Sequence, residues 1–245
     1  MHLSIVTGAS RGLGRAVAEQ LLQRGHRVLS LSRGTWQSQQ ASSGELICWS
    51  VDLADSQAAA ERLREWLASQ KDGALSATLI NNAGVVSQLA PLSAVGAADL
   101  ANAIRVGLEA PMLLTAAFLS ATEAWAVPRK VLMVSSGLGR RAMAGSASYC
   151  AAKAGMDHLA RAVALEEADK PGGARIVSLA PGVIDTDMQA QLRAADETLF
   201  PERKVFVGLQ QGAQLDSPAL AATKLLAYLD RADFGANPVA DVRDA

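Results

Sequence analysis

A tyrosine and a lysine four residues apart have the types and spacing for acid–base chemistry. Tyr149 and Lys153 stand in the stretch Tyr-Cys-Ala-Ala-Lys, and on a helix this spacing puts both side chains on one face. A free phenol has a pKa of about 10, and a nearby ammonium favours the phenolate and lowers that pKa. Such a tyrosine could protonate a carbonyl oxygen while hydride reaches the carbon. Taken alone, the pair could equally lie on a solvated helix face.

A glycine-rich turn near the start of the chain could bind a pyrophosphate. Gly8, Gly12 and Gly14 follow the spacing G-x-x-x-G-x-G directly after an apolar run. Glycine permits a sharp turn and a close approach of the backbone to phosphate, and the helix that follows offers free N–H groups. Because the turn joins a predicted strand to a predicted helix, we interpret it as a dinucleotide-binding turn. The alternative is a turn that needs glycine for its geometry only.

The end of the second predicted strand indicates the cofactor. A carboxylate there accepts the ribose hydroxyl of NAD, whereas a basic residue suits the 2′-phosphate of NADP. No acid follows Ser32; Arg33 comes next, and Arg11 lies in the glycine turn. Arginine can form a charge-assisted fork to a phosphate. We therefore predict NADP(H), the alternative being two solvated arginines.

Short apolar runs alternate with amphipathic stretches, and these are the elements that must position the polar residues. Strands are predicted at Leu3–Thr7, Arg27–Ser32, Leu46–Val51, Ser76–Ile80, Lys130–Ser135 and Arg175–Leu179, and helices at Gly12–Arg24, Ser56–Ser69, Asp99–Ala124 and Ser148–Ala168. Strands that alternate with helices imply parallel pairing through right-handed crossovers. The predicted fold class is α/β, a single doubly wound parallel sheet of Rossmann type. We expect about seven strands, helices on both faces and one domain over residues 1–245.

Polar residues follow three of these strands at the edge where such a sheet binds ligands. Ser136 follows the fifth strand, 13 residues before Tyr149, and Asn81–Gly84 follows the fourth. Ala180–Gly182 follows the sixth. The carboxyl ends of parallel strands lie at one edge, so we expect these segments to meet Tyr149 and the glycine turn there.

In order and spacing, these motifs resemble the short-chain dehydrogenases/reductases, from Leu3 to about Ala190. The resemblance implies that Tyr149 is the proton donor, that Lys153 lowers its pKa and holds the nicotinamide ribose, and that Ser136 binds the substrate carbonyl. It also implies a cofactor site built from Gly8, Ser10, Arg11, Gly12, Leu13, Gly14, Arg33, Asp52, Leu53, Asn82, Ala83, Gly84, Tyr149, Lys153, Pro181, Gly182, Ile184 and Thr186.

One position departs from the family pattern. The family often carries an asparagine four residues before a proline such as Pro111, where it organises a water that links the lysine to solvent. This chain has Gly107 there. The departure is the one feature that favours a rival function, a dinucleotide-binding redox sensor or scaffold without turnover.

The second half of the chain resembles the sepiapterin reductase branch, which includes bacterial reductases of benzil-type diketones. The resemblance implies NADPH-dependent reduction of a ketone or vicinal dicarbonyl on an aromatic or pterin-like substrate. It places Asp244 where an aspartate would anchor a pterin, although a frayed tail is the alternative and Asp241 a weaker candidate. Leu138, Met143 and Met188 would wall the substrate pocket or pack ordinarily. Residues 188–212 are either a substrate lid or a surface excursion.

Composition and charge exclude several function classes. The chain has 23 basic and 24 acidic residues, so no global field attracts nucleic acid or an anionic membrane. Its three histidines and two cysteines are scattered, so we expect no metal site, and two free thiols fit the cytoplasm. The longest uncharged run, Gly73–Ala98, is too polar to be a membrane anchor. By analogy with the fold, we expect a homodimer or homotetramer built on the helices at Asp99–Ala124 and Ser148–Ala168.

Overall fold

One parallel sheet forms the centre of the computed structural model, which describes residues 1–38 and 42–244. Its strands lie in the order β3-β2-β1-β4-β5-β6-β7, and every neighbouring pair is parallel. They are β1 (His2–Thr7), β2 (Arg27–Ser32), β3 (Glu45–Ser50), β4 (Ser76–Asn81), β5 (Arg129–Val134), β6 (Arg175–Ala180) and β7 (Val239–Asp241). The strand order reverses between β1 and β4, as in a doubly wound sheet. The predicted fold class is confirmed.

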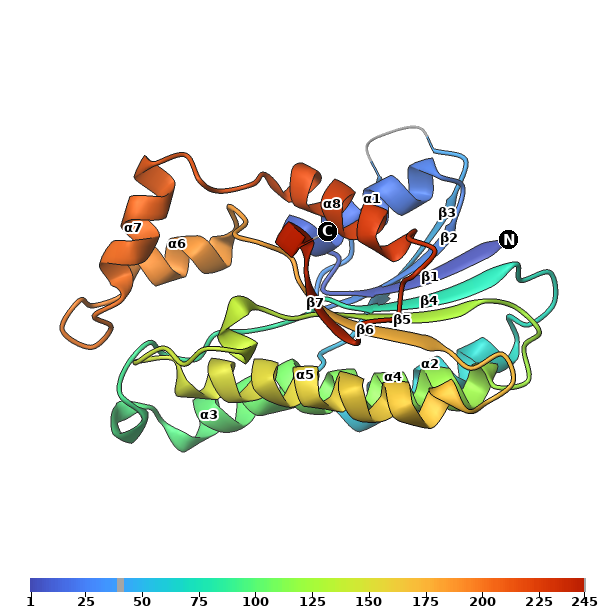
Figure 1. Ribbon diagram of the computed structural model, residues 1–245, viewed down its shortest axis with the longest axis horizontal. Coiled ribbons are helices and arrows are strands. Elements are labelled where there is room, and N and C mark those ends of the chain that lie inside the picture. The colour runs from blue at the N-terminus through green and yellow to red at the C-terminus, as the bar shows by residue number, and fades with distance from the viewer. Residues whose placement is uncertain (39–41, 245) are drawn as a thin grey trace.

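Helices cover both faces of this sheet (Figure 1). On one face α1 (Gly12–Gln23) packs against α8 (Pro218–Leu229). The other face carries three helices, α2 (Ser56–Ala68), α4 (Ala110–Thr122) and α5 (Ala147–Ala168). The remaining helices are α3 (Ala97–Ile104), α6 (Asp187–Ala194) and α7 (Arg203–Gln211), with short turns at η1 (Leu92–Ala94), η2 (Arg105–Glu109), η3 (Gly137–Gly139) and η4 (Val242–Asp244).

Alternating side chains along the strands build two hydrophobic cores. Leu3 and Ile5 of β1 pack into the core shared with α2 and α4, whereas Val6 packs into the core beneath α1 and α8. All three side chains are fully buried. A strand that is buried on both faces has a nearly continuous apolar sequence, which is why the run at the start of the chain predicts a strand.

The long helix predicted at Asp99–Ala124 is continuous but contains a wider turn. It runs from Ala97 to Thr122, and its middle part η2 is a π-helix in which the N–H of Ala110 bonds to the carbonyl of Arg105. Pro111 accounts for the irregularity, because it has no N–H to donate to the carbonyl of Gly107 four residues earlier. The turn therefore lies where the family asparagine is missing.

The same helix is apolar enough to resemble a membrane span. Among the described residues, Ala97–Thr122 alone meets the length and composition of such a span, with a mean hydropathy of 1.4. Half of its apolar window is buried inside the protein, where Leu114 and Phe118 pack against α2. Its composition is thus explained by packing in the core.

Residues 187–211 lie to one side of the sheet (Figure 1). The segment contains α6 and α7, which contact each other and enclose a small hydrophobic cluster of Met143, Leu192, Phe200 and Phe206. The rings of Phe200 and Phe206 stack with their centroids 5.8 Å apart. The weak periodicity of this stretch reflects two short helices that pack on this local cluster and not on the sheet.

Candidate active site

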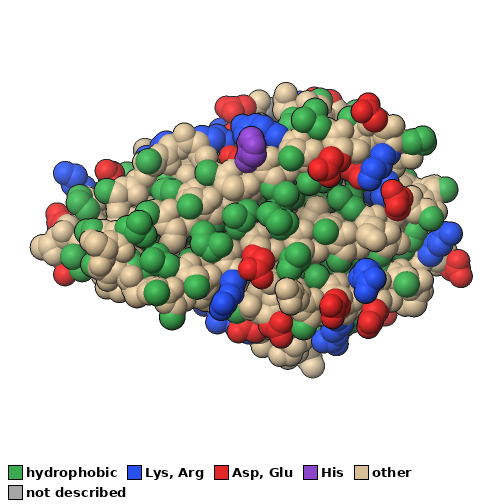
Figure 2. Space-filling model, turned by 90° about the horizontal axis from the view of Figure 1, so that it is seen from below, with side chains coloured by type: hydrophobic (Ala, Val, Ile, Leu, Met, Phe, Trp, Pro, Cys, Tyr) green, Lys and Arg blue, Asp and Glu red, His purple; other side chains and the backbone are tan. Residues whose placement is uncertain are grey.

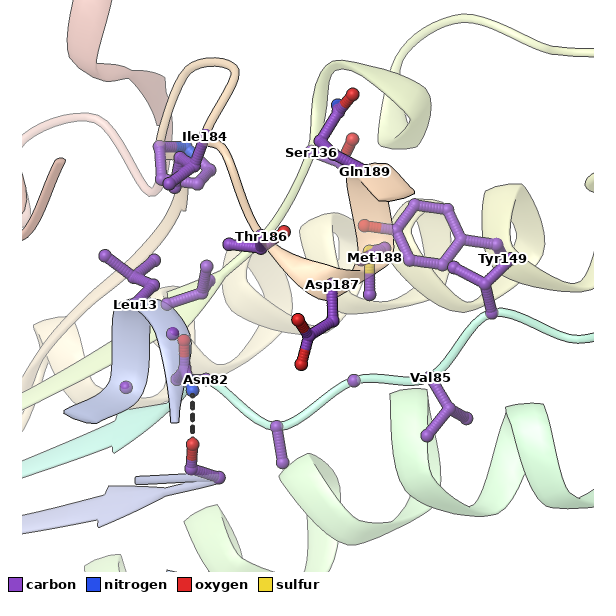
Figure 3. Close-up of a pocket in the computed structure, with 18 of the residues that line it drawn as sticks. Leu13, Asn82, Val85, Ser136, Tyr149, Ile184, Thr186, Asp187, Met188 and Gln189 are labelled. Carbon is purple, nitrogen blue, oxygen red and sulfur yellow. Dashed lines mark hydrogen bonds between the residues drawn. The ribbon is translucent and has the colours of Figure 1, made fainter. Parts of the chain in front are cut away.

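A cavity of about 830 Å³ follows the carboxyl ends of the strands. It is lined by the glycine turn after β1, by the ends of β2 to β6, by the start of α5 and by α6. The sequence-predicted catalytic and cofactor residues all line it, and Figure 3 shows several of them converging from different elements. The sheet edge therefore brings together residues that are up to 178 positions apart, from Gly8 to Thr186.

The glycine turn needs glycine for its backbone conformation at Gly8 and Gly12 and for close packing at Gly14. Gly8 has a φ of +67° and Gly12 a φ of +57°, a region that favours glycine. A Cβ on Gly14 would lie 2.4 Å from the carbonyl oxygen of Gly8 and 2.4 Å from the Asn82 amide nitrogen. The backbone is thus open to a ligand at the N-terminus of α1, and the turn fits the pyrophosphate of a dinucleotide.

The loop after β4 is fastened to this turn. The side-chain amide of Asn82 donates to the carbonyl of Thr7 at 2.9 Å. The backbone N–H groups of Asn82 and Ala83 both donate to the Thr7 hydroxyl at 2.9 Å. These bonds hold Asn82, Ala83 and Gly84 along the cavity wall, where the sequence places them.

The two arginines predicted to bind phosphate differ in their surroundings. The Arg11 guanidinium forms an exposed ion pair with Asp187 of α6, with 2.6 Å between Nη1 and Oδ2. Arg33 is exposed, lines the cavity beside Asp52 and Leu53, and makes no ion pair with any described residue. Arg33 is therefore the arginine that is free to meet a phosphate at this end.

Ser136, Tyr149 and Lys153 meet at the other end of the cavity. Ser136 follows β5 and caps η3 by accepting a bond from the Leu138 N–H at 3.2 Å. Tyr149 and Lys153 lie on the first turns of α5, with the lysine Nζ 5.7 Å from the tyrosine ring centroid. The buried ammonium donates to the carbonyl of Val134 at 2.6 Å.

Burial moves the pKa of both α5 groups. It raises the pKa of Tyr149 to about 12, although a hydrogen bond with Ser136 acts in the opposite direction. It lowers the pKa of Lys153 to about 8, although Asp157 acts in the opposite direction. The predicted lowering of the Tyr149 pKa by Lys153 is thus not found in this structure, because the ammonium is turned to the Val134 carbonyl and desolvation of the phenol dominates.

Sequence reasoning missed a buried carboxylate one turn beyond Lys153. Asp157 Oδ1 accepts hydrogen bonds at 2.6 Å from the hydroxyls of both Ser135 and Ser178, at the ends of β5 and β6. Its other oxygen lies 3.3 Å from Nε of Arg140. The sequence does place Asp157 four positions after Lys153, on the same face of the predicted helix, and this spacing could have indicated it. Asp157 fixes α5, and with it Lys153, to the two strands.

Comparison with known proteins identifies the family. The model of a family described as short chain dehydrogenase matches residues 3–197. The chain is a short-chain dehydrogenase. It is 36% identical over 240 residues to a benzil reductase ((S)-benzoin forming) from Bacillus cereus, covering 96% of both chains. It is 29% identical over 244 residues to a sepiapterin reductase from Xenopus tropicalis, covering 93% of this chain and 91% of that one. The resemblance to this branch is confirmed.

Solved structures agree with this assignment. A short-chain dehydrogenase/reductase from Burkholderia vietnamiensis is 40% identical with a TM-score of 0.68, covering 99% of this chain and 97% of that one. A metagenomic short-chain oxidoreductase in complex with NADP is 28% identical with a TM-score of 0.72, covering 95% and 92%. The chain is thus an oxidoreductase of this family by sequence and by fold.

In this short-chain dehydrogenase the structure separates the two tail aspartates that the sequence left as candidates for binding substrate. Asp244 is exposed and does not line the cavity, so the structure does not bring it to the site. Asp241 does line the cavity, but Arg243 holds both of its oxygens, at 2.8 and 2.6 Å. Nη1 of Arg140 lies 3.9 Å from Oδ2 of the same carboxylate. Of the two tail aspartates, the one that lines the cavity is therefore already held in an ion pair.

The substrate end of the short-chain dehydrogenase is mainly apolar. The predicted wall residues Leu138, Met143 and Met188 all line the cavity. Side chains from α6 and α7 that the sequence did not single out complete this end, namely Leu192, Val205, Phe206 and Leu209. Cys150, beside Tyr149, is partly buried and packs against the local cluster of Met143, Leu192, Phe200 and Phe206.

Proposed function

We propose that the protein is an NADPH-dependent carbonyl reductase that acts on an aromatic vicinal diketone. The arrangement of Ser136, Tyr149 and Lys153 at one end of a cavity whose other end is the glycine turn is the observation that carries the proposal. When bound along the turn, the reduced nicotinamide supplies the hydride. The unpaired Arg33 favours NADPH over NADH through the 2′-phosphate, and an oxidoreductase of similar fold binds NADP.

The chain's own residues handle the oxygen and its proton. The Ser136 hydroxyl donates a hydrogen bond to the substrate carbonyl and stabilises the negative charge that develops there. Tyr149, whose pKa is about 12, keeps its proton at neutral pH and is available to protonate that oxygen. Lys153 is charged below its pKa of about 8, and in the proposed mechanism its ammonium turns from the Val134 carbonyl toward Tyr149 and stabilises the phenolate that remains.

The walls favour an aromatic diketone over a pterin. A pterin presents a guanidine-like edge that needs a free carboxylate. Asp241 is held by Arg243 and Asp244 lies outside the cavity, so no carboxylate of the tail is free to take that edge. Leu138, Met143 and Met188 suit aryl rings, and α6 and α7 form a lid that excludes water. The benzil reductase of Bacillus cereus supports the same choice.

The test is NADPH consumption, followed by loss of absorbance, with benzil, sepiapterin and an aliphatic ketone, and with NADH as the control cofactor. We expect rapid turnover of benzil with NADPH only, and loss of turnover without loss of NADPH binding in Tyr149→Phe. Tight NADPH binding with no turnover of any ketone would instead support the dinucleotide-binding scaffold. Rapid turnover of sepiapterin would overturn the argument from Asp241.

An apolar surface supports assembly of the enzyme through its long helices. Figure 2 shows apolar side chains gathered across the face formed by the lower helices of Figure 1. Met112 of α4 is 43% exposed and Leu165 of α5 is 74% exposed. Two such faces would bury each other, so the proposed form is a homodimer built on α4 and α5. Light scattering should report a dimer that becomes a monomer in Leu165→Glu but not in Leu75→Glu.

A further inference from the structure

Two buried polar atoms on α6 have no hydrogen-bond partner among the residues that the structure describes. They are Oε1 of Gln189 and Nη1 of Arg193, which lie four residues apart on one helix face. Gln189 is only 8% exposed. The nearest ionic contact of Arg193 is through its other terminal nitrogen, 3.6 Å from Asp185. Both residues line the cavity.

These two groups differ from the other unpartnered atoms of the described chain. Such buried atoms also occur on Asn81, Arg129 and Asp157, but none of those residues lines the cavity. A buried donor or acceptor without a partner is costly, and native proteins rarely leave one. Two of them on residues that line one cavity are therefore a sign that a ligand supplies the missing partners.

The pair lies at the reacting end of the cavity. In Figure 3, Gln189 and Met188 are at the same end as Ser136 and Tyr149, away from Leu13 and Asn82 of the cofactor end. Met188 and Leu192, the neighbours of the pair on α6, are apolar cavity residues. The amide and the guanidinium are thus polar groups set within the apolar lid.

We propose that Gln189 and Arg193 bind the second oxygen of a 1,2-dicarbonyl, on the carbon next to the one that is reduced. The inference rests on the proposed function and deepens it. The carbonyl oxygen accepts a hydrogen bond from Nη1 of Arg193, and the Gln189 amide can turn to present its NH₂ to the same oxygen. Ser136 and Tyr149 take the first oxygen.

Two anchored oxygens fix which carbon faces the nicotinamide and from which side. A monoketone of the same shape supplies only one acceptor and leaves the pair on α6 unsatisfied. Sites built to hydrogen-bond a substrate group discriminate strongly against an analogue that lacks it. Gln189 and Arg193 are therefore specificity-determining residues that select diketones and set the handedness of the alcohol.

The test compares benzil with deoxybenzoin, in which one carbonyl of benzil is replaced by CH₂. The ratio of their kcat/KM values is measured for the wild type, Gln189→Leu and Arg193→Met, since the greater intrinsic reactivity of benzil cancels between variants. We expect the ratio to fall about tenfold in Gln189→Leu and about a hundredfold in Arg193→Met, because bonds to charged groups are stronger. The enantiomeric excess of the benzoin product should fall with it.

Gln191→Leu is the matched control, because Gln191 is an exposed glutamine on the same helix that does not line this cavity. Its ratio should equal that of the wild type. Equal losses on both ketones, or an unchanged ratio in both variants, would overturn the inference and show that Gln189 and Arg193 do not bind the second oxygen. The proposed function would survive that result, whereas a wild type that reduces neither ketone would overturn both.

Discussion

Single residues set the chemistry of this site through burial as much as through type. Lys153 and Tyr149 are ordinary side chains, but burial shifts their pKa values in opposite directions, upward for Tyr149 and downward for Lys153, and so favours the neutral form of each. The pairing of Tyr149 with Lys153 could be predicted from the sequence, because residues four positions apart lie on one face of a helix. The direction in which the Tyr149 pKa shifts could not be predicted from the sequence. It depends on which atom the Lys153 ammonium contacts and on how far the phenol is desolvated.

The pH dependence of reduction should follow Lys153. Burial lowers its pKa to about 8, so the side chain is an ammonium below pH 8 and an amine above it. Loss of the ammonium removes the charge that stabilises the Tyr149 phenolate. We expect kcat/KM for benzil to be level below pH 8 and to fall as the pH rises through that value. Lys153→Arg, although slower, should show no such step because guanidinium stays charged. A wild-type rate that rises through pH 8 would contradict the assignment.

Substitution of Gly14 should disrupt the glycine turn. In Gly14→Ala the new methyl would lie 2.4 Å from the Gly8 carbonyl oxygen and from the Asn82 amide, so the turn must open. We expect NADPH binding, followed by titration calorimetry, to weaken by at least about a hundredfold, since the phosphate cradle depends on this close packing. Gly208→Ala is the control, with nothing within 4 Å of its added methyl. Unchanged affinity in Gly14→Ala would show that the cofactor binds elsewhere.

At the scale of helices and strands, the structure shows features that sequence motifs do not predict, such as the π-helical turn of the long helix. The sequence predicted the long helix but not its π-helical turn. Pro111 shows where a backbone hydrogen bond is lost, but packing decides whether the helix kinks or widens there. Here η2 packs against α5, and Gly107 permits the approach, since a Cβ on it would lie 3.0 Å from that of Ala152. Gly107 is thus a packing residue between the long helices.

Packing of these helices predicts a coupled pair of substitutions. Gly107→Ala would press its methyl against Ala152, and we expect it to lower the free energy of unfolding by about 1–3 kcal/mol, as overpacking does. Ala152→Gly alone costs about 1 kcal/mol through helix propensity. The double variant should be destabilised by less than the sum, because the removed methyl makes room. Urea unfolding measures all three. Strict additivity would mean that the two helices separate freely at this point.

At the scale of the whole molecule, long-range polar contacts join the ends of elements. Asp157 links α5 to the end of β5 and to β6, and Arg140 extends that link to β7 by donating to the carbonyl of Ala240 at 2.8 Å. Sequence spacing does not identify partners a hundred residues apart. The contacts of Asp157 and Arg140, and the position of Asp244 outside the cavity, therefore could not be predicted from the sequence. The glycine turn and the α5 pair were found because their geometry is local.

A second long-range link should dominate global stability. Glu167, near the end of α5, lies 3.6 Å from Arg129 at the start of β5, and both side chains are 2% exposed. Burial raises the pKa of Glu167, but bonds from Lys170 and the Ala174 N–H outweigh it and hold the pKa below its usual range. The carboxylate therefore contributes stability above its ordinary pKa, and this stability is lost as the pH falls below it.

Glu167→Gln removes that charge and leaves the Arg129 guanidinium buried without its ionic partner. We expect a loss of about 3–5 kcal/mol in the free energy of unfolding at neutral pH, the range found when one member of a buried pair is removed. The loss should shrink as the pH falls below the ordinary pKa of a glutamate and vanish below the lowered pKa of Glu167, where the wild-type carboxylate is protonated too. Glu166→Gln, on an exposed neighbouring glutamate, should change little. Equal and small effects of both changes in urea unfolding would show that the pair of Glu167 and Arg129 does not fasten α5 to the sheet.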